Sequence, residues 1–247
     1  MTDIKNGINT DAIKAFKKAL RITVKDLQRG LTPEYVEYAD RQICLNILSM
    51  DEYKSAQAVF CFVGTKDEID TTAILQQALD DGKKLLVPKC RPKNVAVSGE
   101  GEGFGGAKTG TRTGAGTSTE AVNTSAGIMD VFEITSLEQL EPGAYGILEP
   151  REGCPMVEPG EIDFGVIPCV SCDKAGHRLG HGGGYYDRYL EMAEKQVKSL
   201  GKKCFPRAVI CRERLMTAEV PAEATDQKMD FVVNEVEIIG LATEADV

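Results

Sequence analysis

Short, unbroken runs of apolar residues, each followed by a helical pattern, restrict the fold of this chain more than any other feature. Residues 58–63 read AVFCFV and residues 162–168 read IDFGVIP. Runs of this kind are typical of strands covered on both faces of a sheet. After the first run, Asp70 is expected to cap a helix that ends before Gly82, and residues 84–88 (KLLVP) form the next strand. This order predicts a doubly wound α/β fold, with a mostly parallel sheet and helices on both faces.

Two helices are expected before the first strand. Residues 11–29 carry apolar side chains at helical spacing, among them Phe16 and Leu27. A threonine followed by a proline, a favourable helix start, opens a second helix over residues 32–49. Later extended segments are expected at 128–135, 145–150, 207–211 and 231–233, and one more helix at 184–199.

The composition changes between residues 94 and 127, where Gly, Ser, Thr and Ala dominate and the periodicity disappears. We expect this segment to be a flexible surface insert in a single domain of residues 1–247. Residues 101–106 form a G-x-G-x-x-G pattern, the form of a dinucleotide-binding fingerprint. The residues after it, AKTGTRTGAGTSTE, cannot make the helix that such a site needs. The pattern is therefore not interpreted as a nucleotide site.

The overall composition indicates a soluble globular protein. The chain has 247 residues, of which 42% are hydrophobic and 27% charged, and a net charge of −9. An acidic balance argues against nucleic-acid binding, and no apolar run reaches the roughly 20 residues that a membrane helix needs. The first residues lack both a secretory apolar core and an arginine-rich transit pattern. We expect a cytoplasmic monomer that binds neither nucleic acid nor membrane.

Eight cysteines are scattered along the chain. Cys44 and Cys61 fall in apolar stretches and are expected to be small buried hydrophobes. Cys169 and Cys172 form a C-x-x-C, which suggests a redox pair or half of a zinc site. There is no second C-x-x-C, and both histidines lie in the glycine-rich segment described next. The favoured interpretation is that these two thiols line the approach to that segment.

The segment 176–188, GHRLGHGGGYYDR, follows a predicted buried strand and precedes a predicted helix. Glycines let backbone amides approach an anion closely, and the start of a helix adds its positive dipole end. Arg178 can add a fixed charge, and Asp187 can hold a metal bound to the same anion. The segment therefore predicts a binding site for the phosphates of a nucleotide. The alternative, a tight connection only, does not explain both charge signs beside the glycines.

The run RLGHGGGYYDRYL, residues 178–190, resembles the signature RLGxGxGYYDxxL of the 5-formyltetrahydrofolate cyclo-ligases, also called 5,10-methenyltetrahydrofolate synthetases. Other features agree in order: a Lys-x-x-x-Arg at 17–21, DEIDT at 67–71 and an acidic D-x-x-x-D at 226–230. The resemblance implies a ligase that uses ATP and Mg²⁺ to cyclise 5-formyltetrahydrofolate, with or without a polyglutamate tail. It implies 5,10-methenyltetrahydrofolate, ADP and phosphate as products, formed through a phosphorylated imidate.

The resemblance also implies roles for individual residues. From the residues alone, a solvated helix face for Lys17 and Arg21, and a surface acid for Asp226, remain open alternatives. The resemblance assigns the catalytic roles to Lys17, Arg21, Arg178 and Tyr185, and the Mg²⁺ to Asp187 and Asp226. The expected ATP-binding residues are Lys17, Lys18, Arg21, Arg178, Leu179, Gly180, His181, Gly182, Gly183, Gly184, Tyr185 and Tyr186. The expected substrate-binding residues are Val63, Glu68, Tyr145, His181, Gly182, Gly183, Gly184 and Tyr185.

One departure from the family pattern concerns His181, which stands where the family usually has arginine. Histidine loses its charge near neutrality and arginine does not, so we expect substrate affinity or turnover to fall as the pH rises through roughly 6 to 7.5. A simpler alternative is that Arg178 and the helix dipole suffice. Two other functions remain open: a non-catalytic binding protein on the same scaffold, or an ATP-using enzyme that acts on another formylated substrate.

Overall fold

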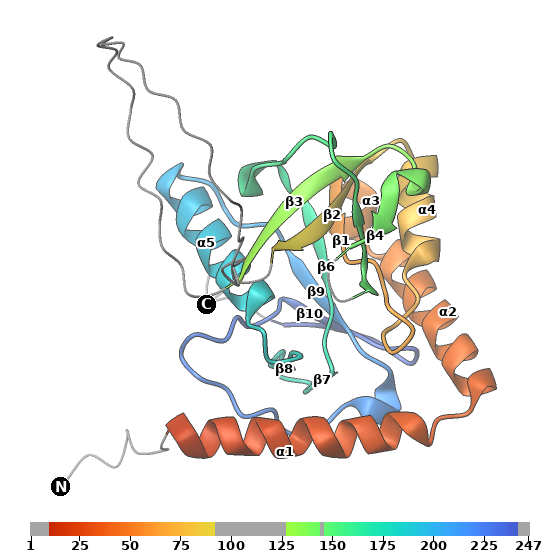
Figure 1. The fold of residues 1–247 in the computed structure, drawn as a ribbon, viewed down its shortest axis with the longest axis vertical. Coiled ribbons are helices and arrows are strands. Elements are labelled where there is room, and N and C mark those ends of the chain that lie inside the picture. The colour runs from red at the N-terminus through yellow and green to blue at the C-terminus, as the bar shows by residue number, and fades with distance from the viewer. Residues whose placement is uncertain (1–9, 92–126, 144–145, 242–247) are drawn as a thin grey trace, which may run out of the picture.

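The computed structural model describes residues 10–91, 127–143 and 146–241 (Figure 1). The expected insert, apart from Gly127, and the G-x-G-x-x-G pattern lie outside the described residues. The α-helices are α1 (Thr10–Arg29), α2 (Pro33–Ser49), α3 (Asp51–Ser55), α4 (Thr72–Asp80) and α5 (Tyr185–Ser199). The strands are β1 (Ala58–Cys61), β2 (Lys84–Arg91), β3 (Ile128–Ile134), β4 (Leu140–Pro142), β5 (Leu148–Pro150), β6 (Phe164–Ile167), β7 (Ser171–Cys172), β8 (Arg178–Leu179), β9 (Arg207–Ile210), β10 (Phe231–Val233) and β11 (Ile238–Gly240).

The central sheet has seven strands in the order β11-β10-β9-β6-β1-β2-β3. The pairs from β10 across to β2 are all parallel, whereas β3 and β11 run antiparallel at the two edges. The chain leaves the sheet after β6, forms the small antiparallel hairpin β7-β8, and returns through α5 to β9. The predicted mostly parallel, doubly wound α/β sheet is confirmed.

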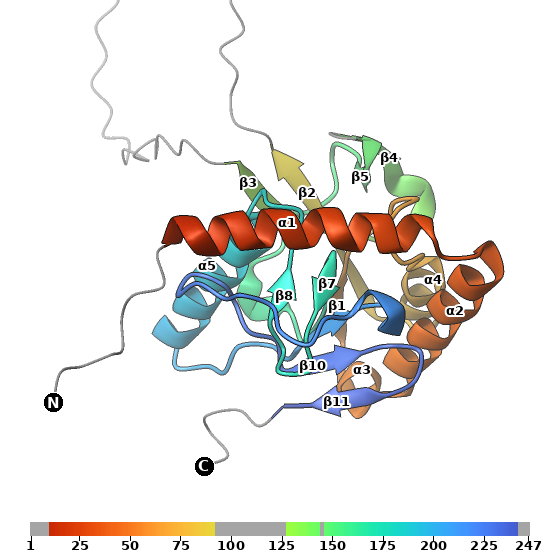
Figure 2. The ribbon, with the colours of Figure 1, turned by 90° about the horizontal axis from the view of Figure 1, so that it is seen from below.

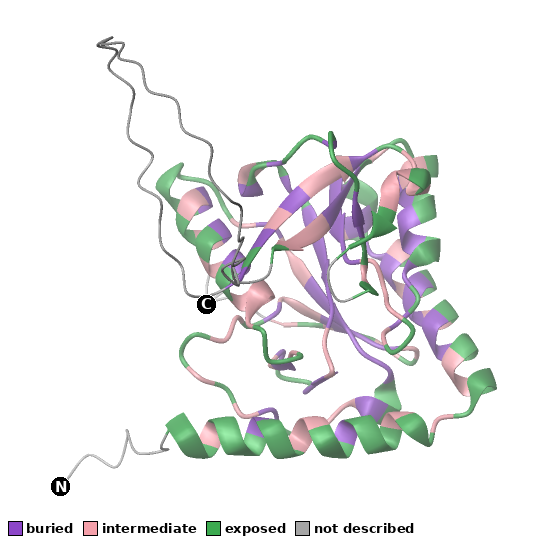
Figure 3. Cartoon of the chain, in the orientation of Figure 1, coloured by how far each residue is buried: buried purple, intermediate pink, exposed green. Residues whose placement is uncertain are grey.

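The core lies on both faces of the sheet, as the unbroken apolar strands predict. On β1, Val59 and Cys61 pack with α2, α3 and α4, while Ala58 and Phe60 pack with α5 and part of α1. All four side chains are at most 3% exposed. Figure 3 shows the buried residues concentrated in the sheet and on the inner sides of these helices. Cys44 and Cys61 are buried, as expected.

Helix α1 differs from the expected amphipathic core helix. It lies across the carboxyl ends of the strands instead of flat against the sheet, as the two perpendicular views show (Figures 1 and 2). Val24 and Leu20 pack into the core, but Phe16 and Leu27 are 67% and 50% exposed. The apolar spacing therefore predicted the helix correctly and its buried face only in part. No helix in the described part of the chain is both long and apolar enough to span a bilayer.

The start of α4 differs by one residue from the prediction, because Thr71 and not Asp70 occupies the N-cap. Asp70 still accepts a hydrogen bond from the amide of Thr72, at 2.9 Å. The hydroxyl of Thr71 donates to the carbonyl of Phe62 and accepts from the amide of Gly64. The segment that contains DEIDT is therefore tied to the carboxyl end of β1.

Candidate active site

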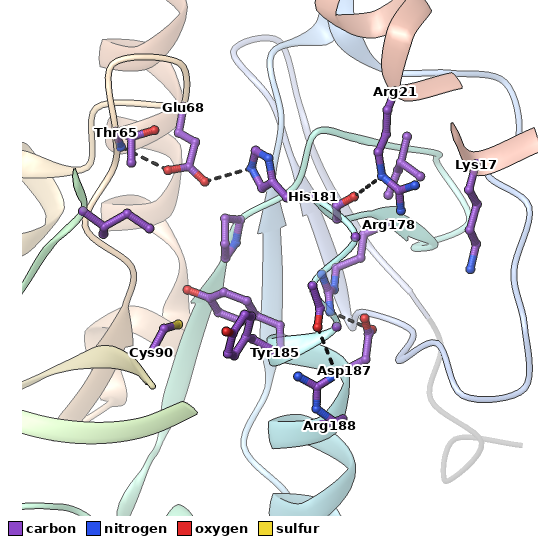
Figure 4. Close-up of a pocket in the computed structure, with 18 of the residues that line it drawn as sticks. Lys17, Arg21, Thr65, Glu68, Cys90, Arg178, His181, Tyr185, Asp187 and Arg188 are labelled. Atoms are coloured by element: carbon purple, nitrogen blue, oxygen red, sulfur yellow. Dashed lines mark hydrogen bonds and ion pairs between the residues drawn. The ribbon is translucent and has the colours of Figure 1, made fainter. Parts of the chain in front are cut away.

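A cavity of about 1360 Å³ lies at the carboxyl ends of β1 and β6 and is lined by residues of α1 as well. Ligands of doubly wound sheets bind at this edge. Residues from α1, from the loop after β1, from the glycine-rich segment and from residues 223–226 meet around the cavity (Figure 4). The predicted site residues that line it are Lys17, Arg21, Glu68, Arg178, Leu179, Gly180, His181, Gly182, Gly183, Gly184, Tyr185, Tyr186, Asp187 and Asp226.

The glycine-rich segment ends directly at the first turn of α5. Gly184 is the N-cap of that helix and has φ +65°, and Gly182 has φ +101°. Both values lie in the left-handed region that glycine adopts without a steric penalty. The segment thereby presents backbone amides and the positive end of the α5 dipole to the cavity, an arrangement suited to an anion.

Arg21 connects α1 to this segment. Its Nε donates to the carbonyl of Gly180 at 2.7 Å. Burial lowers the pKa of Arg21, and the nearby charge of Asp226 opposes that shift. Its fixed charge therefore lies next to the backbone that would surround a phosphate.

Arg178 is 7% exposed and lies at the base of the cavity. Its Nη2 donates to Asp187 Oδ1 at 2.7 Å, and its guanidinium lies 5.7 Å from the ring centre of Tyr186. Within the described residues, its buried Nε has no hydrogen-bond partner. A buried donor without a partner is costly, so this atom is available to an oxygen of a bound ligand.

Lys17 is buried, which rules against the alternative of a solvated helix face. Its Nζ lies 2.5 Å from Asp226 Oδ2 and 3.1 Å from Glu223 Oε2. Lys17 is therefore paired with two acids of the segment before β10. Lys18, one position along the helix, is exposed and does not line the cavity.

Asp187 and Asp226 lie on neighbouring segments, since the amide of Gln227 donates to Asp187 Oδ1 at 3.3 Å. The contacts of Asp187 within the described residues are all made by Oδ1, and those of Asp226 by Oδ2. Each acid thus keeps a second oxygen without a hydrogen bond to the described residues. Oxygen donors from one or two carboxylates are the usual protein ligands of Mg²⁺ at phosphate sites. The two side chains fit that ion.

Glu68, in the loop after β1, points toward His181 of the glycine-rich segment (Figure 4). Its Oε1 lies 3.2 Å from His181 Nε2, and its Oε2 accepts from the amide of Thr65 at 3.1 Å. Burial disfavours the ionised form of Glu68, but the hydrogen bonds from His181 and Thr65 outweigh it, so the pKa of Glu68 lies below its usual value. A carboxylate that stays ionised can accept hydrogen bonds from a ring with N–H donors.

Arg188 is a site residue that the sequence reasoning missed. It donates from Nη1 to the carbonyl of Gly183 and from Nη2 to that of Gly127, and its guanidinium lies 5.4 Å from the ring centre of Tyr185. The available signal was its place in the first turn of α5, directly after the glycine-rich segment. Lys14 also lines the cavity, one helical turn before Lys17.

Three other expectations differ from the structure or lie beyond it. Val63 is half-buried and is absent from the cavity lining, where its neighbour Gly64 is present. Tyr145 lies outside the described residues. Cys169 and Cys172 are absent from the cavity lining, so the interpretation that they line the approach to the glycine-rich segment was wrong. Their sulfurs instead lie close to that of Cys211, which follows the neighbouring strand β9.

Comparisons with known proteins identify the family of the chain. The model of the 5-formyltetrahydrofolate cyclo-ligase family matches residues 13–235. A mitochondrial 5-formyltetrahydrofolate cyclo-ligase of Arabidopsis thaliana is 24% identical over 99% of this chain and 83% of its own, and a mouse 5-formyltetrahydrofolate cyclo-ligase is 23% identical over 90% and 95%. The solved structure of Aquifex aeolicus 5,10-methenyltetrahydrofolate synthetase superimposes with a TM-score of 0.64 at 25% identity, over 92% of this chain and 93% of that one. The resemblance inferred from the glycine signature is thereby confirmed, and the chain belongs to the 5-formyltetrahydrofolate cyclo-ligase family.

Proposed function

We propose that this protein catalyses the ATP- and Mg²⁺-dependent cyclisation of 5-formyltetrahydrofolate to 5,10-methenyltetrahydrofolate, with release of ADP and phosphate. The observation that carries the proposal is that one cavity holds both kinds of recognition group. Phosphate-binding groups line one side, and the carboxylate of Glu68 lies on the other, 3.2 Å from His181 of the glycine-rich segment. Two substrates bound there would have their reacting ends next to each other.

The volume of the cavity supports a site for two substrates. Pockets for one drug-sized ligand usually measure about 300–1,000 Å³. The cavity here is larger, at about 1360 Å³. ATP and a folate would therefore fit side by side.

The triphosphate of ATP is assigned to the glycine-rich segment, the start of α5 and the cations around them. Arg21 and Arg178 approach the segment from α1 and from β8. Lys17 would exchange Asp226 and Glu223 for phosphate oxygens when ATP binds, because a phosphate offers more negative charge than either acid. The lysine would then neutralise charge that develops as the bond to ADP breaks.

The folate is assigned to the side of the cavity formed by Glu68. Its carboxylate would accept two hydrogen bonds from the amino and ring N–H groups of the pterin. Tyr185 lines the same cavity and offers an aromatic surface and a hydroxyl near the phosphate segment. This placement directs N5, with its formyl group, toward the phosphates.

The reaction would take place in two steps. The formyl oxygen attacks the γ-phosphorus, the bond to ADP breaks, and a phosphorylated imidate forms. N10 then attacks the activated formyl carbon, phosphate leaves and takes up the proton that N10 loses, and the five-membered ring closes. Neither step needs a covalent bond to the protein, so positioning and charge neutralisation by the cavity residues would supply the catalysis.

Asp187 and Asp226 would hold the Mg²⁺. When bound, the ion supplies neutralisation of the phosphate charge. Asp187 has a second task within the chain, because it also positions the guanidinium of Arg178. Asp187 would thus contact both the Mg²⁺ and an arginine that binds phosphate.

The direct test combines the purified protein with ATP, Mg²⁺ and 5-formyltetrahydrofolate, and follows the near-ultraviolet absorbance of the cyclised product. We expect one ADP and one phosphate for each methenyl product, and no product when any component is omitted. ATP and folate binding without turnover would instead indicate a binding protein. ADP release only with a different formylated compound would reject the folate assignment.

We further propose that the protein acts in the cytoplasm as a monomer on these small molecules. The mitochondrial relative in Arabidopsis makes the compartment a point to be tested. Imaging of the tagged full-length protein and light scattering of the purified protein test the two statements separately. Mitochondrial import or a stable dimer would contradict them.

A further inference from the structure

Three cysteines meet behind the floor of the candidate active site. Cys169 follows β6, Cys172 lies in β7, and Cys211 follows β9. Their sulfur atoms all lie within 4.8 Å of one another, and none of the three forms a disulfide. The proposed folate reaction makes no use of them.

The fold itself brings the three together. In the parallel pair β6-β9, Gly165 lies opposite Arg207 and Ile167 opposite Val209, an offset of 42 positions. Continuing the same register places Cys169 opposite Cys211, just beyond the strand ends. The chain bends after β6, and this bend brings the sulfur of Cys172 close to those of Cys169 and Cys211. Two adjacent strand ends and one tight turn thus fix the backbone of all three thiols.

The three thiols are largely shielded from solvent, and Cys169 and Cys211 donate to the carbonyls of Ile210 and Arg212 at 3.3 and 3.5 Å. Cys172 is 0% and Cys211 3% exposed, and Cys169 is half-buried. A metal cation can replace the protons of three thiols held this close together, because the cation then neutralises the sulfurs in place of the protons.

We propose that Cys169, Cys172 and Cys211 form a three-thiolate site for a thiophilic closed-shell metal cation, of which Zn²⁺ and Cu⁺ are the biological examples. A metal–sulfur bond of about 2.3 Å places bound sulfurs about 3.8–4.0 Å apart. The observed limit of 4.8 Å needs less than about 1 Å of adjustment to reach that spacing. A disulfide would need the sulfurs at about 2.05 Å, which is a much larger movement.

The donor set also selects the kind of ion. Thiolates favour soft cations and disfavour Mg²⁺, so this site would be distinct from the oxygen site at Asp187 and Asp226. In the described part of the chain, no fourth histidine, cysteine or acid joins the group. A trigonal three-sulfur site, or a four-coordinate one completed by water, is therefore expected. Metal binding releases the remaining thiol protons to solvent, so its affinity weakens in acid.

The site would brace the hairpin that carries the phosphate-binding residues. Cys172 lies opposite Arg178 in the β7-β8 pair, and the amide of Val170 donates to the carbonyl of Leu179 at 2.7 Å. A cation that ties Cys172 to β6 and β9 would fix this hairpin against the central sheet. The expected consequence is a higher melting temperature in the metal-bound form.

The test titrates the reduced full-length protein with Cd²⁺, a spectroscopic substitute for Zn²⁺, and measures the ultraviolet thiolate-to-metal charge-transfer band. We expect one Cd²⁺ per chain, and X-ray absorption of the Zn²⁺ form to count three sulfur ligands. C172S and C211S should each weaken Cd²⁺ binding by more than about 100-fold, the upper end of what loss of an outer-shell partner costs. Competition with Cu⁺ then identifies the preferred ion.

C204S is the matched control, because Cys204 is also a half-buried free cysteine but lies outside the group. It should leave Cd²⁺ binding unchanged. If a serine variant does not fold, the number of sulfur ligands that X-ray absorption finds in the wild-type protein still tests the proposal. Fewer than three sulfur ligands, equal Cd²⁺ binding by C211S and C204S, or a Cys169–Cys172 disulfide that forms in air in place of metal uptake would each overturn the proposal.

Discussion

His181 is the residue for which the sequence predicts a pH-dependent contribution to substrate binding. Histidine is the residue type that ordinarily changes charge between pH 5 and 8, so substrate binding is best examined in that range. His181 lies 3.2 Å from Glu68, whose pKa is held below its usual value, so Glu68 stays ionised across that range. A change in substrate binding between pH 6 and 8 would therefore report on His181 rather than on Glu68.

The first prediction compares wild type with H181R. Histidine as a residue type loses its charge near neutrality and arginine does not, so we expect wild-type affinity for ATP or turnover to fall through roughly pH 6 to 7.5. The arginine variant should show no such fall. The measurement is kcat and KM for both substrates across that range. Flat profiles in both proteins would show that Arg178 and the helix dipole suffice.

Asp187 is the second residue with a specific expectation. D187N removes the charge that would hold Mg²⁺ while keeping the shape of the side chain. We expect turnover to fall by about 100-fold or more, a loss similar to that of one transition-state charge contact. The circular dichroism spectrum should not change. Wild-type turnover of this variant at saturating Mg²⁺ would exclude a metal role.

At the scale of helices and strands, the junction between the glycine-rich segment and α5 leads to a specific prediction. Gly184 is the N-cap of α5, and Gly201 follows Leu200, the C-cap of the same helix. These two glycines have φ values of +65° and +70°. A side chain at Gly184 would lie 2.6 Å from Arg188 Nη1, whereas one at Gly201 would meet nothing within 4 Å. The two glycines thus share a backbone conformation but differ in their neighbours.

The third prediction uses this matched pair. G184A and G201A should each lower the free energy of unfolding by about 1–2 kcal/mol, the cost of a left-handed residue with a Cβ. Only G184A should also raise the dissociation constant for ATP, because Arg188 would be displaced from the carbonyl of Gly183. Chemical denaturation and calorimetric ATP titration measure the two effects. Equal ATP affinity in both variants would argue against a phosphate role for this junction.

At the scale of the whole molecule, a buried ion pair connects distant parts of the site. Arg212, after β9, binds both carboxylate oxygens of Asp40 on α2, at 2.6 and 2.8 Å. The same arginine donates to the carbonyl of Glu68, and Asp40 also accepts from the amide of Asp70. Both side chains of the pair are nearly buried. The loop that carries Glu68 is therefore held by this pair.

The fourth prediction concerns D40A. Removing one partner leaves the charge of Arg212 buried without compensation, so we expect a loss of about 3–5 kcal/mol in the free energy of unfolding. Urea denaturation measures it, and KM for the folate should rise because the Glu68 loop loosens. D51A, which breaks an exposed pair with Lys54, is the control and should change stability by less than about 1 kcal/mol. Equal stability of the two variants would show that the buried pair is not a structural anchor.

The sequence alone determined the class of fold and, through the glycine-rich segment, the family. Unbroken apolar runs on β1 and β6 predicted a sheet covered on both faces, because such side chains must be buried on both sides. The glycines before α5 and the basic residues of α1 were recognisable because each depends on a short stretch of chain. The short strands β7, β8 and β11 carried too few residues to show a period.

Only the tertiary structure decided which side chains meet. Lys17 reaches Asp226 across 209 positions, and His181 reaches Glu68 across 113. The exposure of Phe16 depends on α1 crossing the strand ends, and the meeting of Cys169 with Cys211 depends on the register between β6 and β9. Periodicity and local spacing report on neighbours in the chain, whereas these contacts arise from the packing of whole elements. For that reason, the parts of the site were predictable one by one, and their arrangement was not.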